Sequence, residues 1–271
     1  MITLSSDSLK GYGLNRIFKI VKDAGYDGLD LAIDPKDFDT QNAKYLKELV
    51  EQYQLPVVAI QTSHNATAED IMDAVDMARE LGTKVIVIQP PKMFNFKYTK
   101  WLTNEVPKIR QKENISIALE NATNETFLGV IPEHALANLN ELRKFKHAAI
   151  DTTRVAQKKE DLVNVLNIVK KFLVHVHVSN FRKGKGYALP DEGVLPLESF
   201  LTKLKQDGYR GAISFKISPK FLHVGNEDKV MKNLADCKKF YENYYVKIEA
   251  LPVNIKGVDG KTMKGEEAED E

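Results

Sequence analysis

The feature that most constrains the fold is an alternation, repeated eight times along residues 1–250, of a short apolar run and an amphipathic segment. Short apolar runs bounded by turn residues are typical of buried strands, and apolar residues spaced three or four apart are typical of helices. The predicted strands span residues 2–5, 28–33, 57–62, 84–88, 115–119, 147–150, 172–178 and 212–215. The predicted helices span residues 14–24, 42–53, 67–81, 98–112, 132–144, 161–170, 197–207 and 227–245. Eight βα units over residues 1–250 predict a single α/β domain that closes into a (β/α)8 TIM barrel.

Composition agrees with a globular domain followed by a tail. Apolar residues make up 43% of the 271-residue chain and charged residues 28%, which excludes a disordered or fibrous protein. Residues 251–271 hold three lysines and six acidic residues, so we expect a mobile acidic tail with no catalytic role. The rest of the chain is only mildly basic and shows no concentrated basic stripe. We therefore expect no nucleic-acid partner.

The single cysteine, Cys237, cannot form an internal disulfide, which is typical of a reducing compartment. The first residues lack a basic segment followed by an apolar one, and no apolar run approaches the roughly 20 residues needed to span a bilayer. The sequence thus predicts a cytoplasmic protein without membrane association.

Side-chain alternation predicts which residues line the barrel. In the four later strands, bulky apolar residues share one face, and small or polar residues share the other. Each inward series ends in an ionisable residue: Glu120, Asp151, His177 and Lys216. Barrel enzymes place their sites at the carboxyl ends of the strands, so we predict that these four side chains converge there. His175, one pleat below His177, is predicted to be a hydrogen-bonded residue of the barrel core.

Several sequence blocks, in a fixed order, resemble one family. They are AGYDGLDL at 24–31, ELGTKV at 80–85, ALEN at 118–121, ID at 150–151, VHVH at 174–177, LPDEG at 189–193 and DGYRGA at 207–212. In this order they resemble the xylose isomerase-like barrel superfamily. That superfamily includes sugar phosphate isomerases and epimerases as well as enzymes of the endonuclease IV type. The resemblance covers about residues 1–250 and implies the same eight-stranded barrel.

The resemblance also implies a divalent metal held by four side chains at the ends of strands five to eight. Glu120, Asp151 and His177 match three of them, but Lys216 stands where the strand-eight carboxylate is expected. An ammonium group offers donors and no acceptor, so it cannot ligate a cation. We therefore expect a degenerate metal site that binds no cofactor. The alternative is one weakly bound divalent cation (Mn, Zn or Mg) on Glu120, Asp151 and His177.

Two further departures support the expectation of a metal-free site. Arg154 replaces a histidine that many members of the family carry three residues after the strand-six aspartate, and Asn180 replaces an aspartate after the strand-seven region. Together Lys216 and Arg154 can offset the charges of Glu120 and Asp151, as buried charges require.

For function, the resemblance implies a sugar or sugar phosphate isomerase/epimerase that removes a proton next to a carbonyl of a small polyhydroxylated substrate. We assign Glu120 as the base, His177 as the group that moves a proton, and Lys216 with Arg154 as the donors that stabilise the oxyanion. The predicted substrate contacts are Asp30, His64, Gln89, Arg154, Asn180 and Lys185. Lys185 belongs to the basic, glycine-bearing segment 181–187, which either cradles a phosphate or is an exposed loop.

Two other functions are weighed against this one. If Glu120 and Asp151 pair structurally with Lys216 and Arg154, the protein is a non-catalytic barrel that binds a small molecule or a partner. An apurinic endonuclease is disfavoured because Gln89, Arg154, Tyr187 and Lys216 occupy positions where its three-metal cluster needs ligands.

Overall fold

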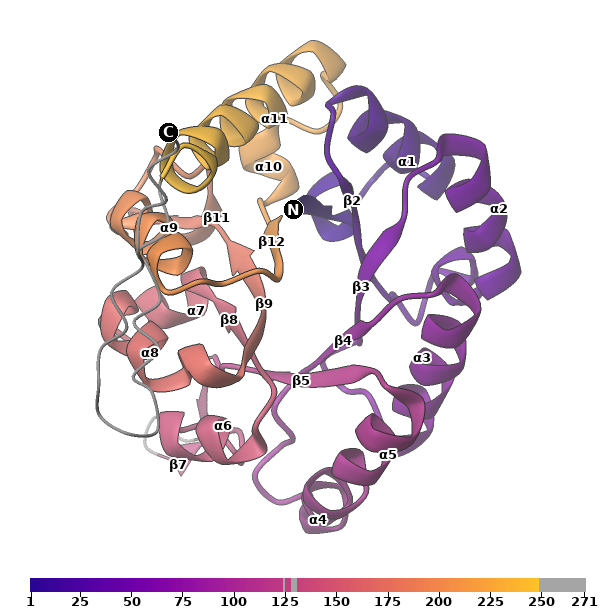
Figure 1. Ribbon diagram of the computed structural model, residues 1–271, viewed down its shortest axis with the longest axis vertical. Coiled ribbons are helices and arrows are strands. Elements are labelled where there is room, and N and C mark those ends of the chain that lie inside the picture. Colours follow the sequence, from indigo (N-terminus) through magenta and orange to yellow (C-terminus); the bar gives the residue numbers. More distant parts are fainter. Residues whose placement is uncertain (124, 128–130, 249–271) are drawn as a thin grey trace, which may run out of the picture.

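Eight parallel strands close into a barrel that is surrounded by helices, as the computed structural model shows (Figure 1). The structure describes residues 1–123, 125–127 and 131–248, so the predicted tail at 251–271 lies outside the described residues. The strands follow the order β1-β12-β9-β8-β5-β4-β3-β2, with β2 pairing again with β1. This topology confirms the predicted single-domain TIM barrel.

The barrel strands lie close to their predicted positions. They are β1 (Ile2–Ser5), β2 (Gly28–Ala32), β3 (Val57–Gln61), β4 (Val85–Ile88), β5 (Ser116–Glu120), β8 (Ala148–Asp151), β9 (Leu173–Val178) and β12 (Ala212–Phe215). The helices are α1 (Leu14–Asp23), α2 (Ala43–Tyr53), α3 (Ala68–Leu81), α4 (Phe96–Asn104), α5 (Val106–Glu113), α6 (Leu139–Phe145), α7 (Thr152–Gln157), α8 (Leu162–Val169), α9 (Leu197–Gln206), α10 (Pro219–Leu222) and α11 (Glu227–Tyr241).

Short elements complete the chain. Two small antiparallel pairs, β6 (Thr126–Phe127) with β7 (Ile131–Pro132) and β10 (Asn180–Arg182) with β11 (Lys185–Ala188), lie outside the barrel sheet. Single turns of 3₁₀ helix form η1 (Ser6–Leu9), η2 (Phe38–Gln41) and η3 (Lys170–Phe172), and a π-helical turn, η4 (Glu242–Val246), follows α11.

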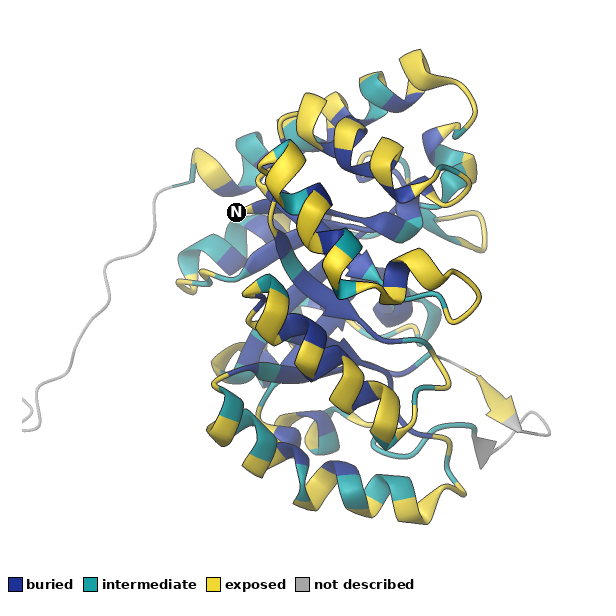
Figure 2. Ribbon diagram, turned by 90° about the vertical axis from the view of Figure 1, so that its right-hand side faces the viewer, coloured by how far each residue is buried: buried dark blue, intermediate teal, exposed yellow. Residues whose placement is uncertain are grey.

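Alternation along the strands separates an apolar outer layer from an inner face that holds the buried polar groups and a small apolar cluster around Ala118 and Ala149. In β2, Leu29 and Leu31 pack into the main hydrophobic core, whereas Asp30 between them points the other way and is also fully buried. Figure 2 shows the result: the barrel strands are buried, and the helices around them expose their outer faces. The apolar side chains between strands and helices hold the barrel together, and they leave the interior free for polar groups.

Local chemistry explains the helix ends. Thr67 begins α3 with a capping box: its hydroxyl accepts from the Asp70 amide at 3.2 Å, and the Asp70 carboxylate accepts from the Thr67 amide at 2.7 Å. Gly82 ends the same helix with a positive φ of 72°, a conformation that glycine adopts without steric cost. Both positions agree with the predicted helix at 67–81.

Three predicted helices differ from the structure. The predicted helix at 98–112 is two helices, α4 and α5, because Pro107 stands in the first turn of α5 and cannot donate a backbone hydrogen bond. The predicted helix at 132–144 is reduced to α6, which Asn138 caps. The last predicted helix, 227–245, is regular only to Tyr241 and ends in the π-helical turn.

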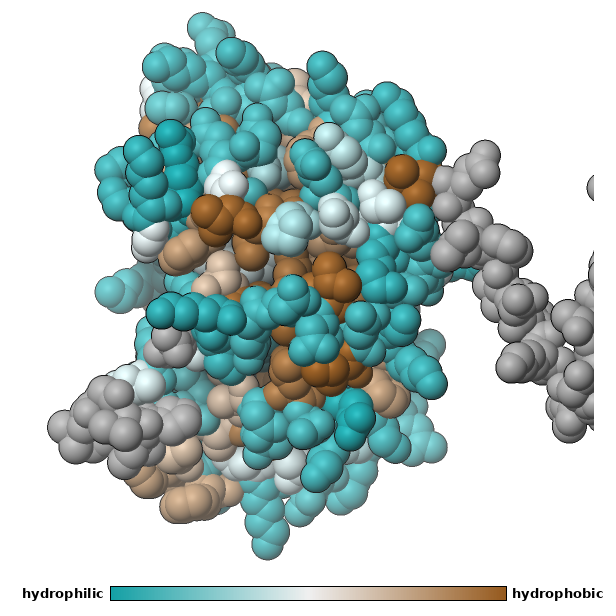
Figure 3. Space-filling model, turned by 90° about the vertical axis from the view of Figure 1, so that its left-hand side faces the viewer, coloured by the Kyte–Doolittle hydropathy of each residue, from teal (hydrophilic) through white to brown (hydrophobic). Residues whose placement is uncertain are grey.

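On the face formed by α8 and α9, hydrophilic side chains surround a band of apolar ones (Figure 3). Among the described residues, no helix combines the length and apolar character needed to cross a membrane.

Candidate functional site

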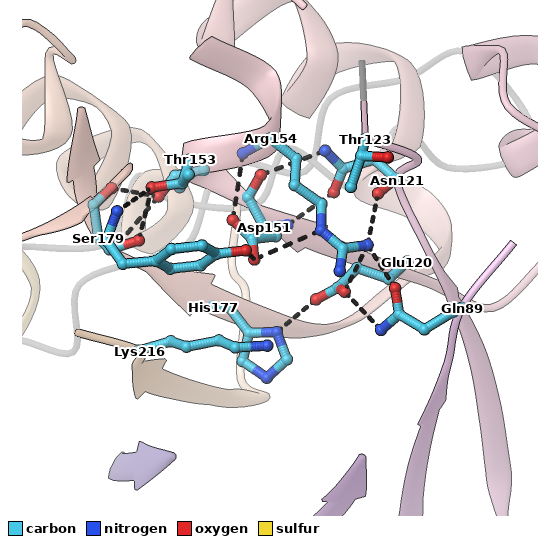
Figure 4. A network of polar contacts seen from close by, with 12 residues as sticks. Gln89, Glu120, Asn121, Thr123, Asp151, Thr153, Arg154, His177, Ser179 and Lys216 are labelled. Atoms are coloured by element: carbon cyan, nitrogen blue, oxygen red, sulfur yellow. Dashed lines mark hydrogen bonds and ion pairs between the residues drawn. The ribbon is translucent and has the colours of Figure 1, made fainter. Parts of the chain in front are cut away.

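Three neighbouring strands bring the predicted ionisable residues together at their carboxyl ends. Glu120 ends β5, Asp151 ends β8 and His177 lies near the end of β9, and all three are fully buried. One ligand atom from each lies within 4.8 Å of the others, as Figure 4 illustrates. The predicted convergence of these three residues therefore holds in the structure.

Three donors surround the carboxylate of Glu120. Arg154 Nη1 lies 2.9 Å from Glu120 Oε2, and Gln89 Nε2 donates to the same oxygen at 2.9 Å. His177 Nδ1 contacts the other oxygen, Oε1. Burial raises the pKa of Glu120, but the positive charges of Arg154 and His177 outweigh it and hold that pKa well below its ordinary range. Glu120 is therefore a stabilised anion in the free protein.

Arg154 is placed by α7, a short helix that begins directly after β8. Asp151 caps this helix by accepting from the Arg154 amide at 3.2 Å, which turns the arginine side chain back over the strand ends. Its guanidinium also donates to Gln89 Oε1 and to the carbonyl oxygen of Asn121. Burial lowers the pKa of Arg154, but the negative charges of Glu120 and Asp151 raise it by more than burial lowers it. This side chain, only 1% exposed, therefore stays charged.

Tyr187 is a residue of this site that the sequence singled out only as standing at a ligand position of the endonuclease cluster. It belongs to β11, and its hydroxyl donates to Asp151 Oδ2 at 3.2 Å, from 36 positions further along the chain. Its backbone has a positive φ of 60°, and its amide donates to Thr153 Oγ1 at 2.9 Å. Nothing in the local sequence signals this long-range contact, because hairpin β10–β11 lacks the apolar alternation that marks the barrel strands.

Lys216 lies elsewhere than expected. Its ammonium donates to Gln61 Oε1 at 2.9 Å and lies 4.0 Å from the carboxylate of Asp7, so it does not pair with Glu120 or Asp151. The physical reason is that Arg154 already covers those carboxylates, while the long lysine side chain reaches Gln61 at the end of β3. Lys216 also lies 5.8 Å from the ring centroid of Tyr187 and remains 8% exposed.

A second ionisable group lies beside the first, in the barrel interior. Asp30 Oδ2 contacts His177 Nε2 at 2.6 Å and His175 Nε2 at 3.1 Å. Burial lowers the pKa of His177, but the charges of Asp30 and Glu120 raise it to about 9. His175 is fully buried, as predicted for a residue of the barrel core. Asp30, predicted to contact substrate, is also fully buried and engaged with both histidines.

Two predicted substrate contacts line a pocket of about 470 Å³ at the ends of β3 and β4. His64 and Gln89 form part of its wall together with Asn65, Lys92 and Tyr98. Burial lowers the pKa of His64, and the nearby charges of Arg154 and Lys216 lower it further, so its imidazole is neutral at neutral pH. Gln89 connects the pocket wall directly to Glu120.

The two remaining predicted contacts lie on and beside the hairpin. Asn180 donates to the carbonyl of Pro190 at 2.7 Å and accepts from the amides of Phe181 and Leu195, so its side-chain amide holds the loop that follows β11. Lys185 is exposed on β11. The segment expected to be a basic loop is therefore a short hairpin, with Tyr187 turned toward the site.

Two groups of side chains could each hold a metal ion: Glu120 with Asp151 and His177, and Asp30 with His175 and His177. In the first group the guanidinium of Arg154 lies 2.9 Å from Glu120 Oε2 and 3.8 Å from Asp151 Oδ2. A divalent ion at that position would have to displace a buried cation from its counter-ions. The expected degenerate site is therefore not confirmed: Glu120, Asp151 and His177 could hold a metal ion, which would compete with the guanidinium of Arg154 for the two carboxylates.

A family model described as "Xylose isomerase-like TIM barrel" matches residues 18–237. The chain belongs to this family. Its relatives include the protein MJ1311 of Methanocaldococcus jannaschii, which is 27% identical over 202 residues, 65% of this chain and 69% of that protein.

Solved structures of similar fold include sugar epimerases. The D-psicose 3-epimerase of Clostridium cellulolyticum H10, solved with D-tagatose, has a TM-score of 0.69 and 14% identity over 90% of this chain and 98% of its own. The IOLI protein, whose structure holds a zinc atom, also has a TM-score of 0.69, with 13% identity over 90% of this chain and 99% of its own. At these identities the likeness shows the fold that the xylose isomerase-like chain shares with them.

Proposed function

We propose that this xylose isomerase-like barrel is an isomerase or epimerase of a small sugar or sugar phosphate, which moves a proton next to the carbonyl of its substrate. The observation that carries the proposal is the convergence of Glu120, Asp151 and His177 on the rim, beside a polar pocket. Its place in the family supports the substrate class, because structural neighbours of the same fold are named for ketose epimerisation.

The pocket at the ends of β3 and β4 suits a polyhydroxylated ligand. Amide, imidazole and ammonium groups on its wall can bind hydroxyl groups, and the ring of Tyr98 offers an apolar surface for one side of a sugar. Gln89 lies on this wall and donates to Glu120, so a carbon held beside Gln89 lies next to the proposed base.

Glu120 is the proposed base and must be released before it can act. In the free protein Arg154, Gln89 and His177 stabilise its charge, which makes it a weak base. Substrate oxygens that accept hydrogen bonds from Arg154 and Gln89 draw those donors away from Glu120. The basicity of Glu120 then rises at the moment when a proton has to be removed. His177, whose pKa of about 9 keeps it protonated at neutral pH, is the group that can give a proton back.

Lys216 and Arg154 are the proposed donors to the oxygens that become negative as the proton leaves. Gln61 takes a single hydrogen bond from the Lys216 ammonium, which has three donors, and Asp7 lies only at 4.0 Å. A partly desolvated cation with spare donors stabilises an enediolate or binds a phosphate group. In this proposal the positive charge at the rim comes from Arg154 and Lys216, and the rim chemistry needs no metal.

A second candidate function is favoured by one observation, the saturation of Glu120. Arg154, Gln89 and His177 all contact its carboxylate, as in a network whose role is purely structural. A barrel of this kind could bind a sugar without converting it, and it would be a binding protein rather than an enzyme.

Product formation separates the two functions. Purified full-length protein is incubated with a panel of ketoses, aldoses and their phosphates, and the sugars are separated by chromatography. We expect conversion of at least one sugar into its isomer or epimer, reduced about 10²-fold or more by Glu120→Gln. The control Glu51→Gln, on the exposed face of α2, keeps full activity. Binding of a sugar without conversion would favour the binding protein, and neither binding nor conversion would refute both functions.

A further inference from the structure

The interior of the barrel holds buried polar atoms that have no hydrogen-bond partner within the part of the chain that the structure describes. They are Thr3 Oγ1, Ser5 Oγ, Asp30 Oδ1, His175 Nδ1 and Ser214 Oγ. All five residues are fully buried. They come from β2, β1, β12 and β9, which are consecutive strands of the barrel, and they belong to the polar, inward-facing series.

These atoms have hydrogen-bonding capacity that the described side chains and backbone do not use. Buried polar atoms in folded proteins almost always have a hydrogen-bond partner, an ordered water or an ion. The register places Thr3 beside Ser214 and Ser5 beside Asp30. The unpartnered atoms are thus neighbours on one side of the barrel, around the second ionisable group.

The same region presents the ligand atoms of a small cation. His175 Nε2 and His177 Nε2 both converge on one oxygen, Asp30 Oδ2, at 3.1 Å and 2.6 Å. The two imidazole rings lie edge to face with centroids 4.7 Å apart, so their Nε2 atoms approach the carboxylate from different directions. Two imidazole nitrogens and one carboxylate oxygen are a ligand set that zinc takes in proteins.

Glu120 orients one of these ligands, His177, through the ring nitrogen that does not face Asp30. His177 presents Nε2 to Asp30 and Nδ1 to Glu120 Oε1. A metal-binding histidine typically donates its second ring N–H to a carboxylate, which fixes the tautomer and the ring orientation. In the rim group this same carboxylate would itself have to be a ligand, and Arg154 covers it.

We propose that the barrel interior holds one divalent cation of the zinc type, bound by Asp30 Oδ2, His175 Nε2 and His177 Nε2. A water molecule or one of the neighbouring hydroxyl groups fills the fourth position. On binding, the cation replaces the proton between Asp30 and His177 Nε2, and this proton leaves to solvent, while His175 binds through Nε2 as a neutral imidazole that carries its one proton on Nδ1. The site shares His177 with the proposed catalytic rim, but the argument for it does not rest on the proposed function.

Metal analysis of the full-length protein tests this site. The protein is refolded with Zn²⁺ or Co²⁺, dialysed, and its metal content is measured by mass spectrometry. X-ray absorption spectroscopy of the unaltered protein then counts the imidazole ligands. The proposed site predicts one ion per chain with two imidazoles, whereas the rim group offers only one, from His177.

Variants provide the second readout. His175→Gln and Asp30→Asn should abolish stoichiometric metal binding, whereas Asp151→Asn should retain it. The matched control His147→Gln, outside both ligand groups, should also retain it. The proposal is overturned if no ion is retained after refolding with either metal, if the spectrum shows a single imidazole, or if Asp151→Asn removes the ion and His175→Gln does not.

Discussion

Arg154 is the residue on which the charge balance of the rim depends. It is 1% exposed and pairs with Glu120 through a contact of 2.9 Å. Replacing it with leucine leaves a buried carboxylate without its counter-ion, which typically costs about 3–5 kcal/mol. We expect the free energy of unfolding, measured by urea denaturation, to fall by that order in Arg154→Leu.

A surface arginine provides the control for this prediction. Arg182 forms an ion pair with Glu192, but both side chains are substantially exposed, and such pairs contribute about 0–1 kcal/mol. Arg182→Leu should therefore leave the free energy of unfolding nearly unchanged. If Arg154→Leu destabilised the protein no more than Arg182→Leu, the assignment of Arg154 as the counter-ion of Glu120 would be wrong.

Lys216 leads to a different prediction. Because it donates to Gln61 rather than to Glu120 or Asp151, Lys216→Met removes one hydrogen bond and no buried ion pair. We expect a loss of about 1 kcal/mol, since a typical hydrogen bond contributes 0.5–1.5 kcal/mol. A larger loss of unfolding free energy, of the size typical for a broken buried ion pair, would be seen only if Lys216 lay against the carboxylates of Glu120 or Asp151.

The pKa of His64 should respond to the loss of the Lys216 charge in Lys216→Met. Burial, Arg154 and Lys216 all lower it, so protonation of His64 favours the unfolded state and stability falls as the pH drops through its ordinary pKa. In Lys216→Met one of the lowering charges is gone, and the pKa of His64 should rise, as NMR titration would show. Lys185→Met, an exposed control, should not change it. An unchanged pKa in Lys216→Met would place Lys216 away from the pocket.

At the level of single residues, the sequence predicted the side of the strand on which a side chain lies better than it predicted the side chain's hydrogen-bond partners. Strand alternation correctly placed Glu120, Asp151 and His177 on the inner rim, because a strand fixes the side on which each residue lies. It could not place the ammonium of Lys216, since a long flexible side chain reaches several acceptors from the same backbone position. The contact of Tyr187 with Asp151 was missed because it joins distant parts of the chain.

The hairpin β10–β11 is the element that completes the site, and its fit against α7 can be tested. A Cβ atom on Gly186 would lie 2.3 Å from Thr153 Cγ2, too close for any real contact. Gly186→Ala should therefore displace the hairpin and break the hydrogen bond from the Tyr187 amide to Thr153. We expect faster hydrogen exchange at the Tyr187 amide.

Gly184→Ala is the matched control for the hairpin. A Cβ atom there meets nothing within 4 Å, and the only cost is its positive φ of 76°. That cost is about 1 kcal/mol and leaves the contact between the hairpin and α7 in place. Equal exchange rates at Tyr187 in both variants would show that the hairpin does not depend on close packing at Gly186.

The sequence predicted helices and strands well where they were long and had a clear apolar periodicity. Each barrel strand and most of the longer helices were predicted to within a few residues, because apolar periodicity marks them clearly. The six-residue helix α7 and the hairpin were missed, since such short segments show no period. These are the elements that bring Arg154 and Tyr187 to the rim, so the barrel was predicted more completely than its site.

On the scale of the whole molecule, the barrel brings three features together at the carboxyl ends of its strands. The strand ends supply the buried network of Glu120, Asp151 and Arg154, the β3 and β4 ends supply the polar pocket, and Lys216 supplies a cation with spare donors. The interior below them is polar as well. On this arrangement rests the proposed proton transfer on a small polyhydroxylated molecule.

Isotope exchange tests the central claim most directly. The protein is incubated in D₂O with each sugar of the panel, and NMR follows deuterium entering the carbon next to the carbonyl. The account predicts exchange in at least one sugar, slowed about 10²-fold or more by Glu120→Gln. Binding of a sugar without any deuterium incorporation, or exchange at the same rate in Glu120→Gln, would contradict it.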